Sequence, residues 1–147
     1  MADDPLSMCP IVIEWPVQWG DQDAFGHVNN TVYLRWFESS RIAYLERLKL
    51  PLSVSREGIG PILAAVHCNY RQQLTYPDRV RVGIRVTRIG RSSLTVAHHV
   101  FSDRRTGVVA EGESVIVYYD YRNLQALEIP RTIRDAIQHL QPESLFT

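Results

Sequence analysis

The chain has 147 residues, of which 45% are hydrophobic and 22% are charged, a composition typical of one folded globular domain. Its 16 basic and 16 acidic residues cancel, so no global charge attracts nucleic acid or an anionic membrane. Cys9 and Cys68 lie far apart without CxxC or His-rich neighbours, which argues against a disulfide framework or a zinc site. Residues 1–9 lack the apolar core of a signal peptide, and no run of about 18 apolar residues occurs. We therefore expect one domain over residues 1–147, in the cytoplasm and without a membrane span.

Hydrophobic periodicity predicts a first strand and then one long helix. The strand covers residues 11–19, and Pro16 within it indicates an edge position or a bulge. The helix is expected over residues 30–50, with Pro51 as a stop. Five residues fall on one face of this helix: Tyr33, Phe37, Ser40, Tyr44 and Leu48. A helix with so wide an aromatic face should lie against a sheet.

The remainder of the chain predicts a run of strands and a short final helix. The strands are expected at residues 62–71, 81–88, 93–101 and 108–119. Alternation of Val80, Val82, Ile84 and Val86 with polar residues or glycine is typical of an antiparallel strand with one buried face. Pro130 then opens a helix over residues 131–140. This order favours an α+β domain in which an antiparallel sheet wraps around one long central helix.

The segment Asp23-Ala24-Phe25-Gly26-His27-Val28-Asn29-Asn30 places a carboxylate and a glycine turn directly before the helix. The first N–H groups of a helix have no partner within it, and the positive end of the helix dipole lies there. Asn29 and Asn30 are both good capping residues. This is how a chain presents a carboxylate beside free backbone donors, and it indicates a catalytic site.

The same segment, with Tyr33 and residues 38–41, closely resembles the hotdog-fold acyl-CoA thioesterases of the 4-hydroxybenzoyl-CoA thioesterase type. The resemblance continues at Tyr76-Pro77-Asp78 and at residues 88–93, and covers about residues 10–120. It implies a hotdog fold, a substrate that is an acyl-CoA or an acyl carrier protein thioester, and Asp23 as the catalytic carboxylate. Coenzyme A would then be part of the substrate, and no other cofactor is expected.

Thioester hydrolysis needs a group that activates water or attacks the carbonyl, and donors for the oxygen on which charge develops. Asp23 can act as general base or as nucleophile, and we favour the base; the backbone around Asn30 can supply the donors. Asp21 is expected to be structural, because only one of the two acids is expected to face the pocket. His27 can hydrogen-bond Asp23 or line the pocket, and Tyr33 can reach the acyl group or pack in the core.

The remaining charged residues give less specific indications of function. Arg88 and Arg91, with the glycine turn between them, can bind the phosphates of coenzyme A, or they can be a solvated hairpin tip. Glu38 is expected to pair with Arg35 or Arg41 at helical spacing rather than to act as a second acid. No metal site is expected, because the strand histidines lack acidic partners at ligand spacing: His67, His98 and His99.

Self-association is also expected, because a lone sheet would leave apolar groups and strand edges exposed. The resemblance implies a homodimer or homotetramer with sites at the interface, where Arg88 and Arg91 can serve the partner's site. Two alternatives to a thioesterase stay open: a hotdog enoyl-CoA hydratase, although the longer acidic segment of such enzymes is absent, and a non-catalytic acyl-CoA binding module, against which Asp23 argues.

Overall fold

The computed structural model describes residues 4–51, 53 and 55–142. Its elements, in chain order, are η1 (Pro5–Met8), β1 (Ile11–Val17), η2 (Trp19–Asp21), α1 (Asn30–Arg47), β2 (Ile59–Tyr70), β3 (Asp78–Ile89), β4 (Ser93–Ser102), β5 (Val108–Asp120), β6 (Gln125–Ala126) and α2 (Arg131–Leu140). The predicted strands and helices are all present. The short elements η1, η2 and β6 were not expected, because three- and four-residue turns and a two-residue strand carry no periodic pattern.

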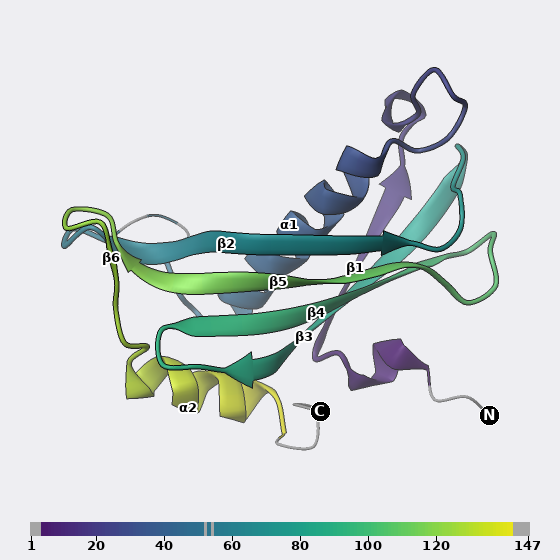
Figure 1. The fold of residues 1–147 in the computed structure, drawn as a ribbon. Coiled ribbons are helices and arrows are strands. Elements are labelled where there is room, and N and C mark those ends of the chain that lie inside the picture. Colours follow the sequence, from purple (N-terminus) through teal and green to yellow (C-terminus); the bar gives the residue numbers. More distant parts are fainter. Residues whose placement is uncertain (1–3, 52, 54, 143–147) are drawn as a thin grey trace.

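One antiparallel sheet, with strand order β1-β3-β4-β5-β2, forms the main layer of the molecule, and β6 adds to β5 (Figure 1). Pro16 lies in β1, which is an edge strand as predicted. The alternation predicted for β3 is also confirmed, because Val80, Val82, Ile84 and Val86 are all fully buried. The other edge is β2, which pairs with β5 along one side.

Helix α1 packs on one face of this sheet through the residues that its periodicity indicated. Tyr33, Phe37, Ser40, Tyr44 and Leu48 are all buried, and α1 contacts β1, β2 and β3. Truncation of a fully buried aromatic side chain such as Phe37 to alanine lowers the free energy of unfolding by about 3–5 kcal/mol. The predicted single central helix is not confirmed as such: α1 has 18 residues, and a second helix, α2, shares the core.

Helix α2 completes the core at the C-terminal end of α1. Ile137 of α2 is fully buried and belongs to one apolar cluster with Tyr44 of α1 and Val86 of β3. Gln141, just after α2, accepts hydrogen bonds from the Val86 N–H (2.9 Å) and from the Tyr44 hydroxyl (3.1 Å). Among the described residues, no helix has the length and hydrophobicity needed to cross a membrane.

Candidate active site

The candidate active site begins in the loop between η2 and α1, where Asp23 closes a tight turn. Its C=O accepts from the Gly26 N–H and its N–H donates to the His27 C=O, both at 3.0 Å. Its Oδ1 accepts from the Phe25 N–H at 2.9 Å. Gly26 has φ +86°, a left-handed conformation that glycine adopts without strain. These bonds fix the direction of the half-buried Asp23 carboxylate.

Asn29 joins this carboxylate to the start of α1. Its Nδ2 donates to Asp23 Oδ2 at 3.0 Å, while its Oδ1 caps the helix by accepting from the Thr31 N–H at 2.9 Å. The Asn29 C=O accepts from the Val32 N–H at 3.0 Å. None of these bonds uses the N–H of Asn30, the first residue of α1. Asn29 therefore links the Asp23 carboxylate to the N-terminus of α1.

Asp21 has a different role from Asp23. Its Oδ2 accepts from the Gln18 N–H at 2.8 Å, which caps η2, and its C=O accepts from the Asn29 N–H at 2.9 Å. Both bonds hold the loop in shape, as expected for a structural residue. The two acids are therefore distinguished by the partners of their carboxylates: that of Asp21 accepts from the backbone before it, and that of Asp23 accepts from the side chain of the helix cap after it.

A hollow of about 360 Å³ opens beside the start of α1, and three residues predicted from the sequence line it: His27, Asn30 and Tyr33. Tyr70 at the end of β2 lines it as well, and its hydroxyl donates to the Asn30 C=O at 3.1 Å. His27 lies on this hollow, and the side chain that donates to the Asp23 carboxylate is that of Asn29. Asp23 itself does not line this hollow in the single chain.

Tyr33 serves both the core and the hollow. Only 3% of it is exposed, and its ring makes edge contacts with Trp36 and Tyr70, with centroids 5.0 and 5.1 Å away. Burial raises the pKa of Tyr33 to about 12, so its hydroxyl stays protonated at neutral pH. It can donate a hydrogen bond but cannot act as a base.

Arg88 and Arg91 lie far from Asp23 within the chain. Tyr76, just before β3, donates its N–H to Gln22 beside Asp23 (3.0 Å), whereas Arg88 and Arg91 follow at the other end of β3, which has 12 residues. At about 3.3 Å per residue this places them roughly 35 Å away. Figure 1 shows the loop before α1 at the upper right and the β3–β4 turn beside α2 at the lower left. One chain therefore does not bring the predicted anion clamp and the predicted catalytic carboxylate together.

A buried polar network ties α1 to the sheet. The Ser40 hydroxyl donates to the Phe37 C=O (2.8 Å), so it accepts from His98 Nδ1–H (3.0 Å). His98 Nε2 then accepts from the Ser114 hydroxyl (2.8 Å), whose oxygen accepts from Arg41 Nη1 (3.1 Å). His98 is fully buried and stacks on Phe37, and burial, with the charge of Arg41, lowers its pKa to about 3. The imidazole is neutral, and the network is structural.

The ion pair expected for Glu38 is not formed. The side-chain ion pairs of the described residues involve other residues, and Arg41 donates to Ser114 instead. Burial lowers the pKa of Arg41, and the charge of Glu38 acts against that shift from a distance. The prediction was wrong because Arg41 turns inward to the buried network rather than along the helix surface.

Sequence reasoning missed two features of this site. Asn29 was interpreted only as a cap, although its amide also donates to Asp23, and an asparagine six residues after an aspartate in a turn gives no pattern for that contact. Tyr70 comes from a distant strand, so only the fold could place it against Asn30. Among the described residues, no group of three or more His, Cys, Asp or Glu side chains could hold a metal ion.

Comparison with known proteins identifies the class. The model of the thioesterase-like superfamily matches residues 17–137. The chain therefore belongs to this superfamily, and its general activity is thioester hydrolysis. The match covers the Asp23 loop, the whole sheet from β2 to β6, and most of α2.

Individual relatives agree with this assignment. A putative esterase of Aquifex aeolicus (strain VF5) is 25% identical over 130 residues, which cover 88% of this chain and 98% of that protein. The PA5185 protein of Pseudomonas aeruginosa strain PAO1 has a similar structure (TM-score 0.81, 28% identity), covering 94% of this chain and 96% of that one. A thioesterase of Thermus thermophilus, solved with coenzyme A and zinc, has a TM-score of 0.76 at 29% identity over 90% of this chain and 95% of that one. These similarities agree with the superfamily that the family model shows, and they do not confirm the 4-hydroxybenzoyl-CoA type.

Proposed function

We propose that this protein hydrolyses acyl-CoA thioesters with Asp23 as general base, in the manner of the 4-hydroxybenzoyl-CoA thioesterase type. The observation that carries the proposal is the hydrogen bond from Asn29 to Asp23 Oδ2, because the same asparagine caps α1. It sets a carboxylate beside the N-terminal donors of a helix. Catalysis of this reaction needs those two groups at one place.

The proposed chemistry uses one water molecule and no metal. Asp23 takes a proton from the water molecule while the oxygen of that water attacks the thioester carbon. The carbonyl oxygen becomes an oxyanion, which the N–H of Asn30 and the positive end of the α1 dipole stabilise. The C–S bond then breaks, and the thiolate leaves and takes up the proton. The alternative, attack by Asp23 itself, passes through a mixed anhydride that water then hydrolyses.

Coenzyme A is the proposed carrier of the acyl group, in preference to an acyl carrier protein. The relative from Thermus thermophilus was solved with coenzyme A, which supports this choice. Arg88 and Arg91 are exposed at the β3–β4 turn and suit its phosphates. Arg134 of α2 donates to the C=O groups of Gly90 (2.8 Å) and Arg91 (3.0 Å), which holds that turn in place.

A homodimer formed through β2 is the proposed working form. β2 is an edge strand, and five consecutive residues in its middle are exposed, from Leu63 to His67. An exposed apolar edge of this length favours pairing with another strand. Such a dimer would let Arg88 and Arg91 of one chain serve the site built around Asp23 of the partner subunit.

A thiol-release assay tests the reaction type. We expect the protein to release coenzyme A from saturated acyl-CoAs, and to release it from crotonyl-CoA rather than hydrate the double bond. Loss of the enoyl absorbance without thiol release would show a hydratase and refute the proposal. Saturable binding of acyl-CoA without either reaction would show a binding module.

A further inference from the structure

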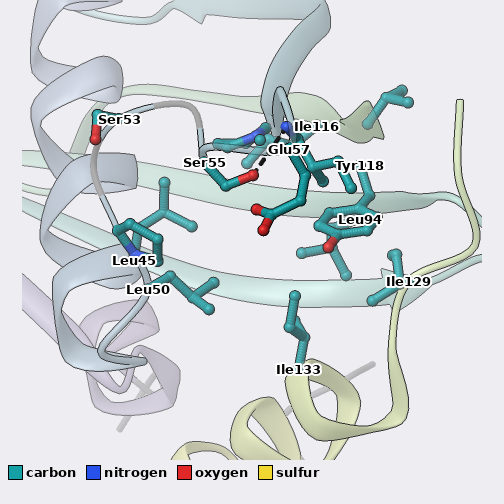
Figure 2. A pocket seen from close by; sticks show the side chains of 15 residues that line it. Leu45, Leu50, Ser53, Ser55, Glu57, Leu94, Ile116, Tyr118, Ile129 and Ile133 are labelled. Carbon is teal, nitrogen blue, oxygen red and sulfur yellow. Dashed lines mark hydrogen bonds between the residues drawn. The ribbon is translucent and has the colours of Figure 1, made fainter. Parts of the chain in front are cut away.

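An apolar cavity lies at the opposite end of α1 from Asp23. It has a volume of about 300 Å³, and its lining includes Leu45, Leu50, Leu94, Ile116, Ile129 and Ile133. Figure 2 shows Leu45 and Leu50 at the end of α1, Leu94 and Ile116 on the sheet, and Ile129 and Ile133 on the C-terminal segment. Three separate parts of the fold therefore form its walls.

One charged side chain is found among the described residues that line this cavity, and it is Glu57. Glu57 is exposed at the rim and reaches between Ser55 and Tyr118 toward the cavity in Figure 2. Hydrogen bonds from its own backbone N–H and from the Ser55 hydroxyl hold the pKa of Glu57 below its usual value. The cavity thus combines an apolar interior with a carboxylate at its opening, and the charge of Arg122 also acts on that carboxylate.

The cavity cannot serve the Asp23 of its own chain. Helix α1 has 18 residues and separates the two by about 27 Å at 1.5 Å per residue. The end of β2 that lines the cavity, at Ile59 and Pro61, is also opposite the end that carries Tyr70. Tyr70 contacts Asn30 at the start of α1. The cavity therefore lies at the Ile59 end of β2, and the candidate active site lies at the Tyr70 end.

Antiparallel pairing of β2 with the β2 of a second copy places the Ile59 end of one strand beside the Tyr70 end of the other. If the strands pair along their whole length, Ile59 lies opposite Tyr70 of the partner subunit, so the start of the partner's α1 reaches the cavity. The turn with Arg88 and Arg91 is on the same side, because the Ile129 N–H of the cavity wall donates to the Arg91 C=O at 2.8 Å. Acyl cavity, phosphate-binding turn and partner carboxylate then form one continuous site.

We propose that this cavity binds the hydrocarbon chain of a neutral aliphatic acyl group of about eight to ten carbons, whose thioester meets Asp23 of the partner subunit. The inference rests on the proposed function and names its substrate class. A methylene is close in size to a water molecule, and a cavity of about 300 Å³ is large enough for a chain of roughly ten such groups. The apolar lining disfavours acyl chains that end in a carboxylate, because that charge would lose its water inside the cavity.

The test measures kcat/KM for butyryl-, octanoyl- and palmitoyl-CoA. We expect octanoyl-CoA to exceed both others by about tenfold or more. Ile133→Trp fills the cavity from α2, and should lower the octanoyl-CoA value by about tenfold relative to the butyryl-CoA value. Val12→Trp, at an exposed apolar position on β1, is the matched control and should change neither.

A further variant keeps the test independent of folding defects in Ile133→Trp. Ile133→Ala enlarges the cavity and should move the preference toward longer chains, while the eight-carbon dicarboxylic acyl-CoA should be a poorer substrate than octanoyl-CoA for both this variant and the wild-type protein. A preference that is the same in the wild-type protein and in these variants would overturn the inference and leave the thioesterase function standing.

A binding measurement separates failure of the inference from failure of the function. Calorimetry with decanoate should show saturable binding that Ile133→Trp weakens and Val12→Trp does not. If decanoate binds in this way but no acyl-CoA is hydrolysed, the cavity assignment stands and the thioesterase function fails. If decanoate does not bind to the wild-type protein, the cavity is not an acyl site.

Discussion

The side chain of Asn29 donates to Oδ2 of Asp23 at 3.0 Å while its own oxygen caps α1. One asparagine thus sets the position of a carboxylate relative to the start of a helix. The carboxylate on one side of it and the N–H of Asn30 on the other are the two groups that the proposed hydrolysis needs. The relationship also allows the two roles of Asn29 to be separated by substitution.

Asn29→Ser keeps the cap and removes the amide donor. Serine is as good an N-cap as asparagine, so the free energy of unfolding should change by less than about 0.5 kcal/mol. Because Asp23 loses a partner that orients it, kcat should fall by about tenfold or more. Urea unfolding and thiol-release kinetics measure the two effects. Unchanged kcat in a stable Asn29→Ser protein would show that the asparagine only caps the helix.

Replacement of the two turn arginines should weaken recognition of coenzyme A. We expect Arg88→Ala combined with Arg91→Ala to raise KM for acyl-CoA by about tenfold, and to leave KM unchanged for an acyl thioester of N-acetylcysteamine, which has no phosphates. Arg35→Ala, at an exposed position on α1, is the matched control. Equal effects on both thioesters would show that the two arginines do not bind the phosphates and are only solvated residues of the hairpin tip.

The β2 edge can be tested by adding a charge. Leu63→Asp places a carboxylate on an exposed position of β2, and should convert a dimer to a monomer because strand pairing would bury that charge. Val12→Asp places the same charge on an equally exposed position of β1, at the other edge of the sheet, and should have no such effect. Sedimentation velocity gives the molecular mass. A wild-type monomer, or a Leu63→Asp dimer, would exclude assembly through β2.

The buried His98 should make stability depend on pH. Its pKa is about 3 in the folded protein against 6.5 as the reference value, so the unfolded chain binds the extra proton between these values. Stability contributed by neutral His98 is therefore full above pH 6.5 and is lost as the pH falls toward 3. For this group alone the loss is about 2 kcal/mol between pH 6.5 and 4.5.

Urea unfolding at several pH values, compared with His98→Asn, isolates that contribution from those of other titrating groups. The variant should be less stable at pH 7 and should lose less stability on acidification than the wild type. If both proteins lose stability by the same amount between pH 6.5 and 4.5, His98 does not titrate as the structure implies. Activity at neutral pH should follow the folded fraction only, because the network does not reach the candidate site.

Local sequence patterns predicted the helices and strands, whereas contacts between residues distant in the sequence determine how the site is built. The aromatic face from Tyr33 to Leu48 and the alternation in β3 follow from periodicity, so they could be predicted within one segment. The contact between Tyr70 and Asn30 joins residues 40 positions apart, and no local pattern reports it. Arg41 illustrates the same limit, because helical spacing favoured Glu38 while the tertiary fold offered Ser114.

The predicted site residues are divided between two places in the molecule, and long-range contacts again explain why. Asp23, His27, Asn30 and Tyr33 lie within 11 consecutive residues, and the structure keeps them around the start of α1. Arg88 and Arg91 follow at the far end of a 12-residue strand, so their distance from Asp23 is set by the sheet. The apolar cavity is built from α1, the sheet and the C-terminal segment together, and no single stretch of sequence indicates it.

The most direct test compares Asp23→Asn with Asp21→Asn in hydrolysis of octanoyl-CoA. Both substitutions remove one charge from the same loop, but only the Asp23 carboxylate accepts from the side chain of Asn29, which caps α1, while the Asp21 carboxylate accepts from the Gln18 N–H, which asparagine can also satisfy. We predict that Asp23→Asn lowers kcat/KM by about 10²–10⁴-fold at unchanged thermal stability, and that Asp21→Asn changes it by less than about threefold. Equal rates for Asp23→Asn and the wild-type protein would contradict the assignment of Asp23 as the catalytic base.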